Sequence, residues 1–186
     1  MKGNRTVVTA VVVIAVLIVG WWLFRRAGSG GAVDLLTEYQ TTERKPDPNA
    51  FAVADATLNG ETKKAIAAPP ESPGSRITWK KVRVPDDGWL RVSVGLSPDV
   101  WTEEGDGVLF MVLVSDGKAS DQLFTQVVNP FGNAADRRWI PVTVDLSAYG
   151  GEEVDLIFNT FASQPGKPGD VRHDKPLWGA PEIVIR

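Results

Sequence analysis

Two different hydrophobicity patterns divide this chain. Residues 6–24 (TVVTAVVVIAVLIVGWWLF) form an unbroken run without a charged residue, whereas the chain beyond residue 49 alternates short apolar runs with polar turns. As a helix, the first run would span about 28 Å, close to the roughly 30 Å hydrocarbon core of a bilayer. The pattern therefore predicts a transmembrane α-helix over 6–24, preceded by a short tail over 1–5.

The flanks of the apolar run match an anchor that stays attached to the protein. Trp21 and Trp22 stand where an interfacial aromatic belt is expected, and Arg25 and Arg26 follow as a polar stop. A cleaved signal peptide is the alternative, but the run is long for one and arginines directly after it disfavour cleavage.

Lys and Arg are balanced on the two sides of the predicted helix, so they do not set its orientation in the membrane. A short tail before a large domain favours a single-pass membrane protein with an extracytoplasmic, periplasmic domain.

Residues 25–48 are expected to connect the anchor to the domain. The stretch 27–32 (AGSGGA) is flexible by composition. The apolar spacing of 33–45 predicts a short helix, which stops before Pro46 because helices tend to end ahead of proline. Its placement stays open between the membrane surface, the domain and a neighbouring protein.

The remaining chain, 49–186, reads as a mostly β domain of the β-sandwich or jelly-roll class. Several runs alternate with period two, and turn pairs such as Asn59-Gly60 separate them. The run 107–115 is apolar at nearly every position, as in a central strand covered on both faces. A phase slip at Lys80–Lys81 predicts a β-bulge. The expected strands are 51–58, 61–68, 75–84, 89–96, 107–115, 121–128, 138–145, 153–160 and 181–186.

Composition excludes several classes of function. A net charge of −3 without a long basic run argues against nucleic acid as a partner. The chain has no cysteine and one histidine, His173, which rules out disulfides, thiolate metal sites and multi-histidine metal sites. No phosphate-binding glycine motif or nucleophile elbow occurs. We therefore expect a protein that is not an enzyme and that holds no cofactor, apart from a candidate structural calcium ion.

The second half of the chain contains sequence motifs typical of a known fold. These are DGVLFMVLVSDG (106–117), RRWIPVTVDLSAYGG (137–151), VDLIFNT (154–160) and LWGAPEIVI (177–185). Together they resemble galactose-binding-domain-like β-sandwiches over about residues 50–186. The resemblance implies a sandwich fold, and its relatives include carbohydrate-binding modules, protein-docking modules and domains of unknown role. Fold likeness of this kind does not assign a ligand.

One candidate site is a ligand or partner surface at loops and strand ends. Sugars stack on exposed aromatic faces while nearby polar groups bond their hydroxyls. The residues that fit are Trp101, Arg137, His173 and Trp178, with Arg138, Asn129 and Asp174 nearby in the sequence. The competing interpretation is that the tryptophans plug the ends of the sandwich and the arginines form ordinary ion pairs.

Calcium is the second candidate, because sandwiches of this type often hold one through carboxylates and carbonyls. The carboxylates that fit are Asp55, Glu103, Asp106 and Glu182. No EF-hand spacing occurs, and residues 102–107 (TEEGDG) fit a solvated turn equally well.

Two functions agree with this pattern. The first, which the sequence favours narrowly, is a non-catalytic accessory subunit whose helix contacts lipid and other integral membrane proteins. Its β domain would brace or cap a larger protein complex, for example a respiratory or photosynthetic one. The second is a membrane-tethered carbohydrate-binding module of the cell envelope, with a glycan as partner. The subunit is preferred because sugar-binding modules usually come attached to an enzyme.

Overall fold

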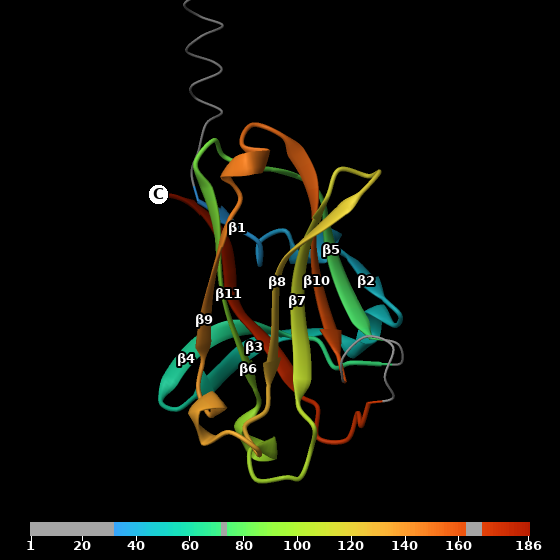
Figure 1. Ribbon diagram of the computed structural model, residues 1–186, viewed down its shortest axis with the longest axis vertical. Coiled ribbons are helices and arrows are strands. Elements are labelled where there is room, and N and C mark those ends of the chain that lie inside the picture. Colours follow the sequence, from blue (N-terminus) through green and yellow to red (C-terminus); the bar gives the residue numbers. More distant parts are fainter. Residues whose placement is uncertain (1–31, 72–73, 163–168) are drawn as a thin grey trace, which may run out of the picture. The chain divides into compact units, whose positions relative to one another are not determined.

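Two antiparallel β-sheets stack face to face in the computed structural model, which describes residues 32–71, 74–162 and 169–186 (Figure 1). One sheet has the strand order β3-β4-β11-β6-β9, with β1 pairing to β11, and the other has the order β2-β5-β10-β7-β8. Short 3₁₀ turns are the helical elements in these residues. The predicted β-sandwich is confirmed.

Most strand bounds lie within a few residues of those expected from the hydrophobic pattern. The strands are β1 (Val33–Asp34), β2 (Glu43–Lys45), β3 (Ala52–Leu58), β4 (Glu61–Ala67), β5 (Ser75–Arg83), β6 (Gly88–Leu96), β7 (Val108–Ser115), β8 (Ser120–Val128), β9 (Ile140–Asp145), β10 (Glu153–Phe161) and β11 (Pro176–Ile185). The 3₁₀ helices are η1 (Tyr39–Thr41), η2 (Pro48–Ala50), η3 (Pro98–Val100), η4 (Ala134–Asp136) and η5 (Ser147–Tyr149).

Side chains that alternate along the strands fill the space between the two sheets. In β6, Leu90, Val92 and Val94 belong to the central core, whereas Arg91 faces solvent. Strand β7 lies between β10 and β8, and its first five residues are all buried, as expected for a strand covered on both faces.

The predicted bulge at Lys80–Lys81 is present in β5. The pairing register between β5 and β10 shifts at this point, and Lys81 has a φ of 53°. Asp155 of β10 accepts hydrogen bonds from the Lys80 side chain at 2.8 Å and from the Lys81 backbone N–H at 3.1 Å. The Asp155 carboxylate on the neighbouring strand therefore stabilises the bulge.

The segment 33–45 does not form the predicted helix, and residues 33–48 are not a free linker. Val33–Asp34 pairs with β11, and Glu43–Lys45 pairs with β5. Leu35 and Tyr39 are buried in the central core, and the Leu35 carbonyl accepts a hydrogen bond from Trp79 Nε1 at 2.9 Å. Pairing with β11 and β5 satisfies this backbone and outweighs the weak local preference for helix.

The predicted membrane anchor falls outside the described part of the chain. The tail 1–5, the predicted helix 6–24 and its flanking residues Trp21, Trp22, Arg25 and Arg26 all precede residue 32. Within the described ranges, no helix has the length and apolar character needed to cross a bilayer.

The sandwich has two distinct ends. Strands β6 and β11 pair from Leu96 with Pro176 at one end to Gly88 with Ile185 at the other. Loops 97–107, 129–139 and 169–175 gather at the first end, called the loop end here, which is the lower end in Figure 1. β1 pairs Val33 with Ile183, so residue 33 enters the sandwich near the opposite end.

Candidate functional site at the loop end

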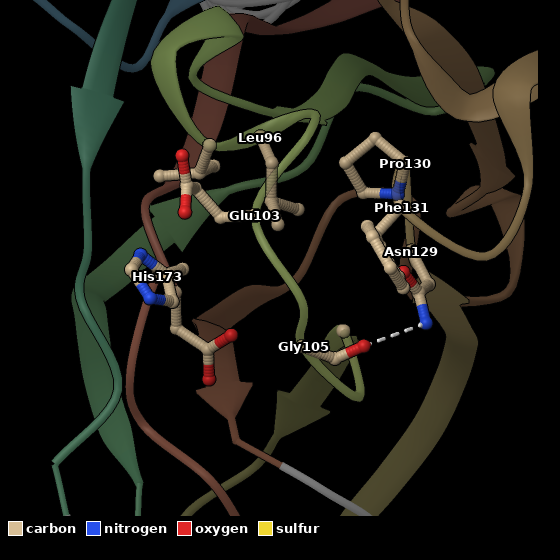
Figure 2. A pocket seen from close by; sticks show the side chains of 10 residues that line it. Leu96, Glu103, Gly105, Asn129, Pro130, Phe131 and His173 are labelled. Atoms are coloured by element: carbon tan, nitrogen blue, oxygen red, sulfur yellow. Dashed lines mark hydrogen bonds between the residues drawn. The ribbon is translucent and has the colours of Figure 1, made fainter.

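A small cavity opens where the three loops of the loop end meet. Its volume is about 10 Å³, and Leu96 and Val100 form part of its apolar wall. In Figure 2, Glu103 and His173 lie on one side of the cavity, and Asn129 and Phe131 lie on the other. A space of this size holds about one water molecule, so the cavity can accept one small polar group.

Asn129 ties two of these loops together. Its Nδ2 donates to the Gly105 carbonyl oxygen at 3.2 Å (Figure 2). Its Oδ1 accepts from the Gly132 backbone N–H at 2.9 Å. Its own backbone N–H donates to Asp136 Oδ2 at 2.9 Å. Gly107 packs so closely that an added Cβ would lie 2.7 Å from the Asn129 Cβ. The start of loop 129–139 is therefore rigidly seated on loop 97–107.

Arg137 and Trp101 are partly exposed and hold the loops in place through hydrogen bonds to backbone carbonyls. Arg137 Nε donates to the Pro130 carbonyl at 2.9 Å, and its Nη2 donates to the Trp101 carbonyl at 3.3 Å. Trp101 Nε1 donates to the Leu96 carbonyl at 2.8 Å, and its ring packs on a small cluster centred on Trp139. The indole of Trp139 is held in turn by the Glu61 carbonyl at 3.0 Å.

The prediction that Trp178 belongs to a binding surface is wrong. Its side chain is 0% exposed and packs between the sheets against Phe110 and Phe158, with ring centroids 5.0 and 4.4 Å away. The position lies in β11, where alternation turns this ring toward the core. The competing interpretation, a tryptophan that fills the sandwich, describes Trp178 correctly.

Phe131 is an aromatic residue of the site that sequence reasoning missed. Its ring is 47% exposed and lines the cavity. The signal was present in the sequence, because an aromatic residue between the turn-forming Pro130 and Gly132 has no strand to pack into.

His173 lines the same cavity from the opposite loop. The residue is exposed and has a φ of 64°, in the left-handed region that is uncommon for residues other than glycine. Such backbone outliers persist where the surrounding structure imposes them, and they concentrate at functional sites.

Asp174 is the buried acid of the cavity. Its residue is 6% exposed, and its Oδ2 has no hydrogen-bond partner in the described part of the chain. Burial, and then the negative charges of Asp106 and Asp170, raises the pKa of Asp174 to about 8.

The four calcium candidates do not converge. Asp55 faces Lys64 across β3 and β4, and Glu182 of β11 is paired with Arg91 at 2.9 Å. Glu103 and Asp106 lie in the loop between η3 and β7. Across residues 32–71, 74–162 and 169–186, no three His, Asp or Glu side chains are grouped so that they could hold a metal ion.

A larger groove lies on the outer face of the sheet that contains β5 and β10. Its volume is about 280 Å³, and no aromatic side chain lines it. Several of its charges pair with one another, since Lys80 lies 2.8 Å from Asp155 and 3.7 Å from Glu43. The loop-end cavity therefore combines aromatic and polar groups in a way that this groove does not.

The sequence does not place the chain in a known protein family. No protein-family model matches the chain. An uncharacterized protein of Archaeoglobus fulgidus is 39% identical over 110 residues, which cover 59% of this chain and 27% of that protein. The chain thus matches about a quarter of the length of that relative.

Solved structures of other proteins share the fold of the described chain. The carbohydrate-binding module CBM51 of Clostridium perfringens GH95, solved with methyl-galactose, matches with a TM-score of 0.55 at 15% identity over 83% of this chain and 100% of that chain. The CBM51-2 and INT domains of C. perfringens ZmpB, solved with GlcNAc, match with a TM-score of 0.50 at 12% identity over 84% of this chain and 32% of that chain. The described chain therefore has the galactose-binding-like β-sandwich fold of carbohydrate-binding modules, as its sequence resemblance implied.

Proposed function

We propose that this protein is a non-catalytic carbohydrate-binding module whose ligand binds at the loop end. The observation that carries the proposal is the half-exposed ring of Phe131 beside a cavity lined by Asn129, His173 and Glu103. A sugar ring has an apolar C–H face and a rim of hydroxyls. An aromatic face with a few placed polar groups suits such a ligand.

The size of the cavity limits how a sugar would sit. About 10 Å³ accommodates a single group the size of a water molecule. The sugar ring would therefore lie on the rim against Phe131, and one of its substituents would enter the cavity. This arrangement favours recognition of a terminal sugar unit.

The location of the cavity suits a tethered module. The loop end lies where Leu96 pairs with Pro176, whereas the chain enters the sandwich beside Ile183, near the pairing of Gly88 with Ile185. Along β6, these ends are about 26 Å apart. Residue 33, which follows the predicted anchor in the chain, therefore lies toward the end of the sandwich opposite to the proposed site.

The accessory-subunit role that the sequence favoured has no support from the comparisons. The alternative weighed with it, a membrane-tethered module that binds glycans, is supported by the fold. We therefore adopt the alternative.

The test is direct glycan binding by the full-length chain in detergent. Screening on a glycan array, followed by calorimetry on each hit, should identify a ligand for the unaltered protein. Phe131→Ala should weaken binding by about tenfold or more, because it removes the stacking face. Ile185→Ala is the matched control, since Ile185 is 44% exposed at the opposite end of the sandwich.

The two measurements distinguish a wrong function from a wrong location of the site. If no glycan binds the unaltered protein, the proposed function is wrong. If glycans bind but Phe131→Ala has no effect, the function holds and the proposed location is wrong.

A further inference from the structure

The loop-end cavity offers carboxyl groups to whatever enters it. Its titratable lining consists of Glu103, Asp174 and His173, and no lysine or arginine of the described residues lines it. Asp106 and Asp170 add negative charge close to Asp174. An anionic group would be repelled here, whereas a cationic group would be attracted.

Three cations of the loop end are engaged elsewhere. Arg172 pairs with Asp170 at 2.5 Å, and Lys175 pairs with Asp99. The Arg137 guanidinium donates to backbone carbonyls of two loops. None of these three cations lines the cavity, so none of them offsets the charge of Glu103 or of an ionised Asp174 there.

Asp174 supplies an independent observation that points to a ligand. The side chain lines the cavity, is more than nine-tenths buried, and its Oδ2 finds no donor among the described residues. Buried polar atoms without a partner are rare in folded proteins. A small donor that occupies the cavity would supply the missing hydrogen bond.

We propose that the cavity binds the protonated amino group of an amino sugar, so that the recognised glycan carries a free, non-acetylated hexosamine amine. This inference rests on the proposed function and names its ligand class. An ammonium group donates three hydrogen bonds and fits a space that holds one water molecule. The acceptors on offer are the carboxylates of Asp174 and Glu103 and the carbonyl of Gly105.

A metal ion fits the same cavity less well. Calcium takes six to eight oxygen ligands, and no three acidic or histidine side chains in the described ranges are grouped to hold a metal. An ammonium group needs fewer acceptors, and its sugar ring could stack on Phe131 at the same time.

N-acetylation would abolish this recognition for two reasons. It removes the positive charge, and it adds atoms that a cavity of about 10 Å³ cannot hold. Binding of the ammonium would also favour the ionised form of Asp174, because an opposite charge lowers the pKa of a carboxyl group. The pKa of Asp174 in the free protein is about 8, so amine binding near pH 6.5 should release a proton.

Calorimetry with the full-length chain near pH 6.5 tests this inference. The ligands are oligosaccharides of glucosamine and of galactosamine, each compared with its N-acetylated counterpart, in two buffers of different ionisation enthalpy. The free-amine form should bind about tenfold more tightly and release up to one proton, whereas the acetylated form should release none.

Two variants assign the effect to the cavity. Asp174→Asn should lose both the preference for the amine and the proton release, and Glu103→Gln, at an exposed position, should weaken the preference without threatening the fold. Glu153→Gln removes one exposed carboxylate at the other end of the sandwich and should leave both readouts unchanged.

Three outcomes would overturn the amino-sugar assignment. These are equal affinity for free and acetylated sugars, amine binding without proton release, and calcium binding that Asp174→Asn abolishes. Each leaves glycan binding itself intact. Failure of every sugar to bind would instead remove the proposed function on which the inference rests.

Discussion

Asn129 Nδ2 donates a hydrogen bond to the Gly105 carbonyl oxygen at 3.2 Å, across two loops that are 24 residues apart in the sequence. The Oδ1 of the same side chain receives the Gly132 backbone N–H. One amide group therefore sets the relative position of Phe131 and Glu103 on opposite sides of the cavity. The shape of the proposed site therefore depends on the two hydrogen bonds of this side chain.

Replacing Asn129 with alanine should loosen the loop end. The change removes two side-chain hydrogen bonds and leaves backbone groups without partners, so we expect a loss of about 1–3 kcal/mol in the free energy of unfolding. Asn49→Ala, which removes a solvent-exposed contact with Asp47, should cost under about 0.5 kcal/mol. Urea denaturation measures both, and equal effects would contradict the linking role of Asn129.

His173 should tolerate glycine better than a β-branched residue. Its φ of 64° is open to glycine at no steric cost, whereas an L-residue pays about 1–2 kcal/mol there. His173→Gly should therefore be at least as stable as the unaltered protein, and His173→Val should be about 1–2 kcal/mol less stable than the glycine variant in thermal unfolding. If valine proved as stable as glycine, the left-handed backbone at this position would be wrong.

Asp174 should make the stability of the sandwich fall as the pH rises from about 4 to about 8. The folded-state pKa of Asp174 is about 8, against the ordinary aspartate pKa of 3.8, so in this window the folded chain holds a proton that the unfolded chain has released. The slope is at most about 1.4 kcal/mol per pH unit and vanishes above the folded-state pKa.

Asp174→Asn should flatten this slope. Glu43, Asp99 and Asp155 have lowered pKa values and act with the opposite sign, so their contribution is lost only as the pH falls below about 4. Unfolding curves at pH 5, 6, 7 and 8 would separate the two effects. A wild-type protein whose stability did not change between pH 5 and 8 would contradict the burial of a protonated Asp174.

Gly179→Ala should disturb the site from the outer face of the sheet. An added Cβ would lie 2.8 Å from Cζ3 of Trp139, the residue that ends loop 129–139. Overpacking of this kind costs about 1–3 kcal/mol. Because Trp139→Leu would vacate the space, the double variant should recover part of the loss, and a double-mutant cycle with no coupling would contradict the contact.

The predicted anchor should hold the full-length protein in membranes. An uncharged run over 6–24 is expected to resist washing with alkaline carbonate, and deletion of residues 1–26 should release the domain into the wash. Fractionation followed by immunoblotting measures both. Release of the full-length chain by carbonate would contradict the anchor without bearing on glycan binding.

The local pattern of the sequence was enough to predict most of the strands. Period-two alternation located β6, and the continuous apolar run located β7, because each pattern reflects how a strand is buried on one face or on both. The phase slip at Lys80–Lys81 located the bulge for the same reason. These features depend on neighbouring residues alone, so they can be read without a partner strand.

Only the tertiary structure decided the roles of residues whose environment is built from distant segments. The stretch 33–45 pairs with β11 and β5, far along the chain, and this pairing overrides its helical spacing. Trp178 is buried and Phe131 is exposed, although both are aromatic residues near turns. Burial depends on which loops and sheets meet at a position, and that information is spread over the whole chain. The burial of the Asp174 carboxyl group and the cavity beside it likewise depend on loops that are distant in the sequence.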